Sequence, residues 1–208
     1  MLYLETISTD TLDLLRKIQS LDIFRETRLV GGTALALQYG HRKSIDLDFF
    51  GKIIASDEEI EYELIQLGKL TILNKSKAIK IFSLNDVKID IVNYQYKWLS
   101  ECIIDNDIRL ADPADIGAMK LSAITGRGSR KDFFDLFFLL KHYTLKDLFE
   151  FYTNKFPQAS EFLVLKSLIY FEDAEHDADP DMFDRAVTWS VVKKHIQQAH
   201  AAYFKNLL

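Results

Sequence analysis

The sequence predicts an α+β fold, with a small mixed sheet flanked by helices and a helical C-terminal half. Two observations predict it. Runs with the alternation and β-branched residues of strands lie before residue 95, whereas amphipathic helical patterns fill most of the chain after residue 112. The length of 208 residues fits one domain or a small core with a helical appendage. We therefore expect an α/β core over residues 1–110 and a helical region over 111–208 that packs on it.

The first half alternates helical and strand-like segments. Gly40 ends a short buried helix, and Asn85-Asp86 suits a tight hairpin turn. Residues 28–30 form a short apolar segment that directly precedes two glycines. The expected elements are helices over 8–22, 33–39 and 57–67 and strands over 45–50, 70–73, 79–84 and 87–94.

The second half begins with a well-defined helix start at Asp112-Pro113, because Asp is a favoured cap and Pro a favoured first helical residue. This helix should end near Thr125, before the glycines of Gly126-Arg127-Gly128. The acidic stretch 172–181 is expected to be a linker or a long loop. Further helices are expected over 130–142, 144–154, 158–171 and 184–205.

Composition and charge set limits on the function. With 48% hydrophobic and 12% aromatic residues, the chain can build a packed core. The net charge of −5 argues against a nucleic-acid partner, but six acids lie within 172–181, and without them the rest of the chain carries +1. The single cysteine excludes an internal disulfide, and neither a signal peptide nor an apolar run of about 18 residues is present. We expect a soluble, cytoplasmic protein without a membrane partner.

Asp46 and Asp48 form the most informative pair of acids. They are separated by one residue in a predicted strand, so both carboxylates should project from one face, while Ile45, Leu47 and Phe49 pack on the other. Two acids so close repel each other, and a divalent cation removes that conflict. The alternative is a solvated pair on the open face of a sheet.

Two further features favour a functional role for this pair. In Lys88-Ile89-Asp90, the lysine and the aspartate share one face of another strand, and if the two strands are neighbours, Asp90 can complete a three-carboxylate set. Gly31-Gly32-Thr33 lies between an apolar strand and a helix, where amide groups can bind phosphate. An ordinary strand-to-helix turn with Thr33 as a cap would give the same pattern.

These motifs resemble those of the DNA polymerase β-type nucleotidyltransferases, in which an apolar residue, Gly and Gly or Ser precede Asp-x-Asp by about a dozen residues. Thirteen residues separate Val30-Gly31-Gly32 from Asp46-Leu47-Asp48 here. The whole stretch 31–50 resembles the AbiEii/AbiGii-type branch, the nucleotidyltransferase toxins of bacterial toxin–antitoxin and phage-defence systems. Within about 28–140, its other motifs have counterparts in the same order, namely Lys88-Ile89-Asp90, Asp112-Pro113 with Lys120-Leu121-Ser122-Ala123, and Arg130-Lys131-Asp132.

The resemblance implies transfer of a nucleoside monophosphate from an NTP to an acceptor hydroxyl, with Mg²⁺ or Mn²⁺ as cofactor. The implied metal ligands are Asp46, Asp48 and Asp90, which with Lys120 form the implied catalytic set. The implied nucleotide-binding residues are Gly31, Gly32, Thr33, Arg42, Lys120, Arg127 and Asp132. Gly32 stands where many relatives have Ser, and no family motif follows residue 145.

The basic and acidic residues outside the strands have structural alternatives. Lys120 and Arg127 lie along one helical face, as the β- and γ-phosphates require, but a solvated basic surface would look the same. Asp132 is either a functional acid or the third helical residue of a capping box with Ser129. Asp135, one turn later, could position Arg127 or Lys120, but a surface role is favoured.

The loop that contains Arg42 either binds a nucleotide or RNA phosphate or is simply solvated. With Arg127, Arg130 and Lys131 it would give a local positive rim.

Three functions remain open. The leading one is transfer to RNA, with a tRNA 3′ end as the acceptor, by a growth-inhibiting toxin that has a cognate antitoxin protein. The second keeps the chemistry but uses a protein hydroxyl or a small molecule as acceptor. The third is a nucleotide-binding regulator without turnover, against which the intact Asp46, Asp48, Asp90 and Lys120 argue. No residue indicates which NTP is used.

Overall fold

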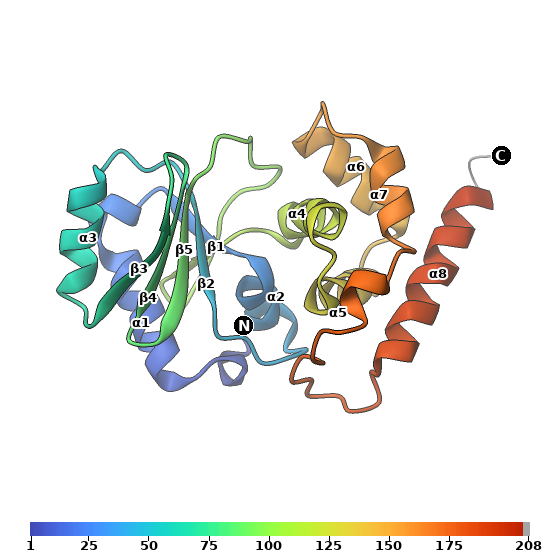
Figure 1. Ribbon diagram of the computed structural model, residues 1–208, viewed down its shortest axis with the longest axis horizontal. Coiled ribbons are helices and arrows are strands. Elements are labelled where there is room, and N and C mark those ends of the chain that lie inside the picture. Colours follow the sequence, from blue (N-terminus) through green and yellow to red (C-terminus); the bar gives the residue numbers. More distant parts are fainter. Residues whose placement is uncertain (206–208) are drawn as a thin grey trace. The chain divides into compact units, whose positions relative to one another are not determined.

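The computed structural model describes residues 1–205 and divides into two compact units (Figure 1). Unit 1 contains residues 1–95 and 101–111, and unit 2 contains residues 96–100 and the chain from residue 112. Unit 1 holds the sheet with three helices, and unit 2 is helical. The α+β class predicted from the sequence is confirmed.

The described strands form one seven-stranded mixed sheet in the order β3-β4-β5-β2-β1-β7-β6. At its centre β2 runs antiparallel to β1 and parallel to β5, so two strands far apart in the sequence lie side by side. The strand bounds are β1 Thr27–Val30, β2 Leu47–Gly51, β3 Leu70–Lys75, β4 Ile79–Leu84, β5 Val87–Asn93, β6 Ile103–Asp105 and β7 Ile108–Leu110.

The helices of unit 1 begin and end largely where the sequence predicts. In α1 the Ser8 hydroxyl accepts a hydrogen bond from the Thr11 amide, and α2 ends at Gly40 in the left-handed conformation, with φ +64°. These helices pack on the sheet: α1 contacts β7, α2 contacts β1 and β2, and α3 contacts β3. The bounds are α1 Thr9–Ser20, α2 Gly31–Tyr39 and α3 Asp57–Ile65, with short 3-10 helices η1 Leu4–Thr6 and η2 Asp22–Phe24.

Some strand predictions need correction. β2 begins at Leu47, two residues later than predicted, and Ile45 is 69% exposed instead of packing against helices. Leu47 and Phe49 are fully buried, as predicted. The hairpin of β6 and β7 was not predicted, although its turn residues Asn106 and Asp107 have the same positive φ as Asn85 and Asp86 in the predicted hairpin.

Unit 2 is built from five helices in its described part. Asp112 caps α4 by accepting from the Ala114 amide, as predicted. The predicted helix over 158–171 is limited to seven residues, and the last helix begins at Trp189. The bounds are α4 Pro113–Gly126, α5 Arg130–Leu139, α6 Leu145–Lys155, α7 Glu161–Ser167 and α8 Trp189–Lys205, with a 3-10 helix η3 Glu172–Ala174. Over residues 1–205 no helix has the length and apolar character to cross a membrane.

A buried ion pair explains why residues 96–100 belong to unit 2. The Lys155 ammonium and the Asp115 carboxylate are fully buried, with Nζ and Oδ1 2.6 Å apart. Asp115 also accepts hydrogen bonds from the amides of Leu99 and Ser100, and Lys155 donates to the carbonyl oxygen of Lys97. The loop is therefore fixed by its backbone, which no side-chain pattern in the sequence reveals.

Candidate functional site

Asp48 and Asp90 are direct neighbours across two parallel strands. In the register of β2 and β5 they are paired residues, so their side chains project from the same face of the sheet. The sequence predicted that Asp90 could join the first pair of acids if the two strands were neighbours. They are, and Asp90 lies beside Asp48. Lys88 shares this face, with its Nζ 2.6 Å from Oδ1 of Asp90, and its ammonium neutralises part of the local negative charge.

Gly31 lies directly beside the Asp48 carboxylate. It has φ +70°, a conformation that favours glycine, and a Cβ built on it would overlap Oδ2 of Asp48. A side chain where β1 passes into α2 would therefore displace the Asp48 carboxylate. Gly32 follows Gly31, and both glycines are partly exposed. Their backbone is open to a ligand at the first turn of a helix, a position that suits phosphate.

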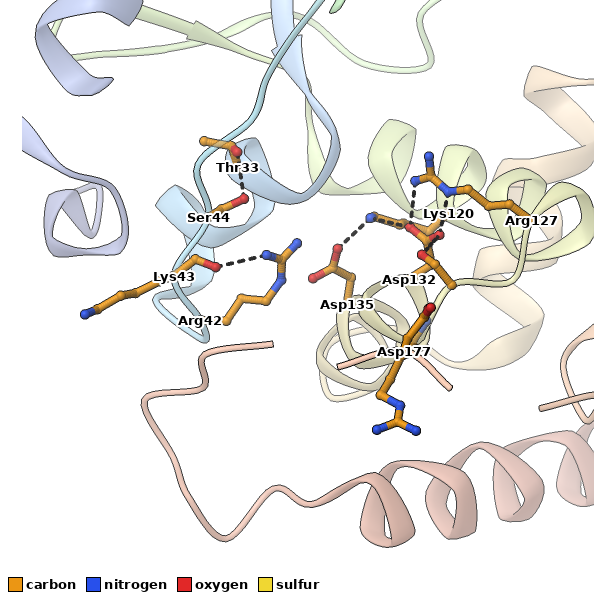
Figure 2. A network of polar contacts seen from close by, with 11 residues as sticks. Thr33, Arg42, Lys43, Ser44, Lys120, Arg127, Asp132, Asp135 and Asp177 are labelled. Carbon is orange, nitrogen blue, oxygen red and sulfur yellow. Dashed lines mark hydrogen bonds and ion pairs between the residues drawn. The ribbon is translucent and has the colours of Figure 1, made fainter. Parts of the chain in front are cut away.

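Thr33 is held within the protein. It is fully buried, its hydroxyl is 2.8 Å from the Ser44 hydroxyl, and it also donates to the carbonyl oxygen of Asp46 (Figure 2). The side chain thereby joins the start of α2 to the residues before β2. Asp46 itself lies just before the strand, so only Asp48 of the predicted pair is in β2. Thr33 is not the helix cap, because that position belongs to Val30.

The carboxylates suit a hard divalent cation, although they do not form a complete cage. Across residues 1–205 no three His, Cys, Asp or Glu side chains are grouped to hold a metal. Mg²⁺ does not require such a group, because one or two carboxylates together with substrate phosphates commonly bind it. Asp48 and Asp90, adjacent and on one face, offer that number of ligands. The donor set therefore fits Mg²⁺ bound together with a nucleotide.

In unit 2, Lys120 is held between two aspartates (Figure 2). Its Nζ is 2.9 Å from Oδ1 of Asp132 and 2.5 Å from Oδ2 of Asp135, and the lysine is 5% exposed. Both aspartates are fully buried. The ammonium is thus held in one position by two helices, since Lys120 belongs to α4 and both acids belong to α5.

Arg127 reaches the same carboxylate from the end of α4. Its Nε donates to Oδ2 and its Nη2 to Oδ1 of Asp132, at 2.9 and 3.1 Å, and its side chain is 62% exposed. Ser129 donates its hydroxyl to Oδ2 at 2.6 Å. Burial alone would raise the pKa of Asp132, but Lys120, Arg127 and Ser129 together hold it well below its usual value. Asp132 is therefore a permanent anion that orients two cations.

Two predictions for this region are wrong. Ser129 is the first residue before α5, but its hydroxyl makes no capping bond to the backbone, so the capping box does not form. The Asp132 carboxylate binds cations instead, because a charged partner is a stronger one than an amide. Asp135 is not at the surface. The less favoured alternative, that it positions Lys120, agrees with the contact between the two side chains.

The residues predicted to form a basic rim differ in their exposure. Arg42 is 5% exposed and donates to the Lys43 carbonyl oxygen at 3.0 Å, so the alternative of a solvated Arg42 is wrong. Arg130 is 12% exposed, and its guanidinium is bound by backbone and side-chain oxygens of the stretch 172–181. Arg127 and Lys131 remain the exposed basic residues of the four.

Relatives match nearly the whole chain. Residues 13–207 match the family described as nucleotidyl transferase AbiEii toxin, type IV toxin–antitoxin system. A protein of Aquifex aeolicus, described only as uncharacterized, is 36% identical over 198 residues, which cover 92% of this chain and 95% of that protein.

Solved structures share the fold. The nucleotidyltransferase toxin MenT4 of Mycobacterium tuberculosis superposes with a TM-score of 0.58 at 14% identity, over 92% of this chain and 80% of that one. The Helicobacter pylori protein JHP933 superposes with a TM-score of 0.54 at 19% identity, over 96% of each chain.

Proposed function

The chain belongs to the AbiEii family of nucleotidyltransferase toxins, and on this premise we propose that it transfers a nucleoside monophosphate from an NTP to a hydroxyl of RNA. The preferred acceptor in this proposal is a tRNA 3′ end, the cofactor is Mg²⁺ or Mn²⁺, and the reaction takes place in the cytoplasm. A cognate antitoxin protein is the proposed partner. That the protein is a nucleotidyltransferase follows from the family itself.

The observation that carries the proposal is the pairing of Asp48 with Asp90 beside Gly31. In the proposed site these two carboxylates bind the metal together with phosphate oxygens of the nucleotide, and Asp46, just before β2, is the third proposed ligand. A bound Mg²⁺ would supply charge neutralisation at the phosphate oxygens. The oxygen of the acceptor hydroxyl attacks the α-phosphorus, the bond to pyrophosphate breaks, and Asp90 accepts the hydroxyl proton.

The remaining site residues bind phosphate in this proposal. Gly31 and Gly32 offer backbone amides at the start of α2. Thr33, being buried, acts by fixing the segment before Asp46, and Arg42 binds a phosphate oxygen. The Lys120 ammonium is held by two carboxylates, and exposed Arg127 presents a fork suited to phosphate. Asp132 contributes by orienting both cations.

The test is incubation of the protein with each α-labelled NTP, Mg²⁺ or Mn²⁺, and either total tRNA or cell lysate. Label in RNA is expected. Asp48→Asn should abolish incorporation. The control Asp86→Asn should not, because it replaces the same kind of carboxylate at an exposed turn, where φ is +64° and Asn is tolerated. Label in protein or in a small molecule would contradict the RNA acceptor. Binding without transfer in every pool would contradict turnover, and full activity of Asp48→Asn would contradict the metal site.

A further inference from the structure

The acidic stretch 172–181, here called the acidic segment, holds the start of α5 instead of serving as a free linker. Arg130 is the first residue of α5, and its guanidinium donates to three oxygens of the segment. These are the carbonyl oxygens of Ala174 and Glu175, at 2.9 and 2.7 Å, and Oδ1 of Asp179, at 2.9 Å. Such a set of fixed acceptors matches the planar fork of an arginine.

A further contact reaches the helix backbone. The amide of Arg130 donates to Oδ2 of Asp177 at 2.8 Å, across 47 positions of sequence. In Figure 2, Asp177 lies at the start of α5. The first amides of a helix have no partner within the helix, and a negative charge there is favourable. Asp177 therefore supplies at α5 what a local capping residue supplies elsewhere.

The Ser129 side chain makes a different contact from the one that its position suggests. Ser129 occupies the usual capping position, yet its hydroxyl donates to the Asp132 carboxylate at 2.6 Å and accepts no capping bond. Asp132 lies in the first turn of α5, two residues after Arg130, and binds both Lys120 and Arg127. The position of the first turn thus determines where the two cations are held.

The segment is in turn fixed to the last helix. Glu175 accepts hydrogen bonds from the indole of Trp189 at 3.1 Å and from Lys193 at 2.6 Å. The Arg130 guanidinium also lies 5.1 Å from the centre of the Trp189 ring. The acidic segment is therefore a bridge from α8 to the first turn of α5.

We propose that the acidic segment, chiefly through Asp177, is a positioning element that sets the first turn of α5 and so aligns Lys120 and Arg127 for the phosphates of the nucleotide. The inference rests on the proposed function, because it assigns phosphate binding to these two cations. Asp177 itself touches neither cation in the described contacts and acts through Asp132.

Asp177→Ala tests the inference, with Asp173→Ala as the matched control. Asp173 is an exposed acid of the same segment, and none of the described contacts to Arg130 comes from it. Equilibrium dialysis with Mg²⁺ and each labelled NTP should show roughly fivefold weaker binding for Asp177→Ala and no change for the control. Asp177→Asn should restore much of the affinity, because its amide oxygen can accept the Arg130 amide.

A double-mutant cycle separates positioning from simple stabilisation. In an Asp132→Asn background, Asp177→Ala should weaken NTP binding no further if it acts through Asp132. Additive losses, or an equal loss in the Asp173→Ala control, would overturn the inference.

Hydrogen exchange gives a readout that does not depend on the nucleotide. The amides at the start of α5 should exchange faster in Asp177→Ala than in the wild type and in Asp173→Ala. Unchanged exchange would overturn the inference even if the wild type binds NTP. Absence of NTP binding by the wild type would contradict the proposed function, while faster exchange in the same preparation would still support the capping of α5 by Asp177.

Discussion

The carboxylate of Asp48 fills the space that a side chain at position 31 would occupy. A side chain here would push the carboxylate aside, and the φ of +70° favours glycine. The two residues belong to β2 and to the start of α2, which are separated by a loop. The turn proposed to bind phosphate and the acid proposed to bind the metal thus lie side by side.

Gly31→Ala should reduce nucleotidyl transfer at least tenfold, because the new methyl group displaces the Asp48 carboxylate and strains the backbone. Gly126→Ala is the matched control, since a Cβ at Gly126 meets no atom within 4 Å and the position is helical. The control should keep full activity and a melting temperature no lower than that of the wild type. Steady-state incorporation of labelled NTP measures the activity of both variants, and thermal unfolding measures their melting temperatures. Equal activity of the two variants would contradict the steric argument.

Lys88→Met should increase the apparent affinity for Mg²⁺. The Lys88 ammonium lies 2.6 Å from Asp90 Oδ1 and competes with a cation for that carboxylate, although its side chain is 42% exposed. Because exposed ion pairs are weak, the half-saturating Mg²⁺ concentration should fall by about threefold. Titration of activity against Mg²⁺ measures it, with Lys77→Met as a control at an exposed lysine. A higher Mg²⁺ requirement in Lys88→Met would show that the lysine assists metal binding instead.

The stability of the fold should depend on Asp132 in a pH-dependent way. Its pKa is lowered in the folded protein, because Lys120, Arg127 and Ser129 outweigh the effect of burial. The unfolded chain takes up this proton near pH 3.9. The stabilisation is therefore complete above about pH 5 and is lost as the pH falls below the unfolded value towards the lower folded one.

Comparison with Asp132→Asn isolates this effect. The difference in free energy of unfolding between the wild type and the variant should be constant from pH 5 to 7 and shrink below about pH 4. Denaturant titrations at each pH measure it, with Asp173→Asn as the exposed control. Parallel pH curves for the wild type and Asp132→Asn would argue against a charged Asp132 bound by cations.

Asp115→Ala should lower the free energy of unfolding by about 3–5 kcal/mol, because it leaves the Lys155 ammonium buried without its carboxylate. The double variant Asp115→Ala/Lys155→Met should be more stable than the single one, since no unpaired charge is then buried at this position. Chemical denaturation measures both. Limited proteolysis should also cut residues 96–100 faster in the single variant, and a double variant less stable than the single one would contradict the account.

Local signals in the sequence predicted the elements with strong start and stop residues. Asp112-Pro113 predicted α4, and Asn85-Asp86 predicted the hairpin of β4 and β5. The hairpin of β6 and β7 has the same Asn-Asp turn, but strands of three residues are too short for alternation to be visible. Short strands are defined by their neighbours in the sheet, which a single sequence does not give.

The candidate site was predictable where its residues are close in sequence. The approach of Asp90 to Asp48 needed the strand order, which the sequence argument could state only as a condition. Asp135 was assigned to the surface because an acid in a helix is usually solvated. Lys120 was one of two partners that the sequence suggested, but the packing of α4 against α5 was needed to show that Asp135 is buried against it.

The loop 96–100 has a consequence for how the chain is made. It leaves the ribosome long before its partner Lys155, which follows Lys97 by 58 positions. Until α6 has been synthesised, the amides of Leu99 and Ser100 can bind the Asp115 carboxylate, but Lys155, the partner of Asp115 in the ion pair, is absent. Neither unit is encoded by one uninterrupted stretch of the gene, so a truncation after residue 111 would yield the complete sheet with a loop that has no site to occupy.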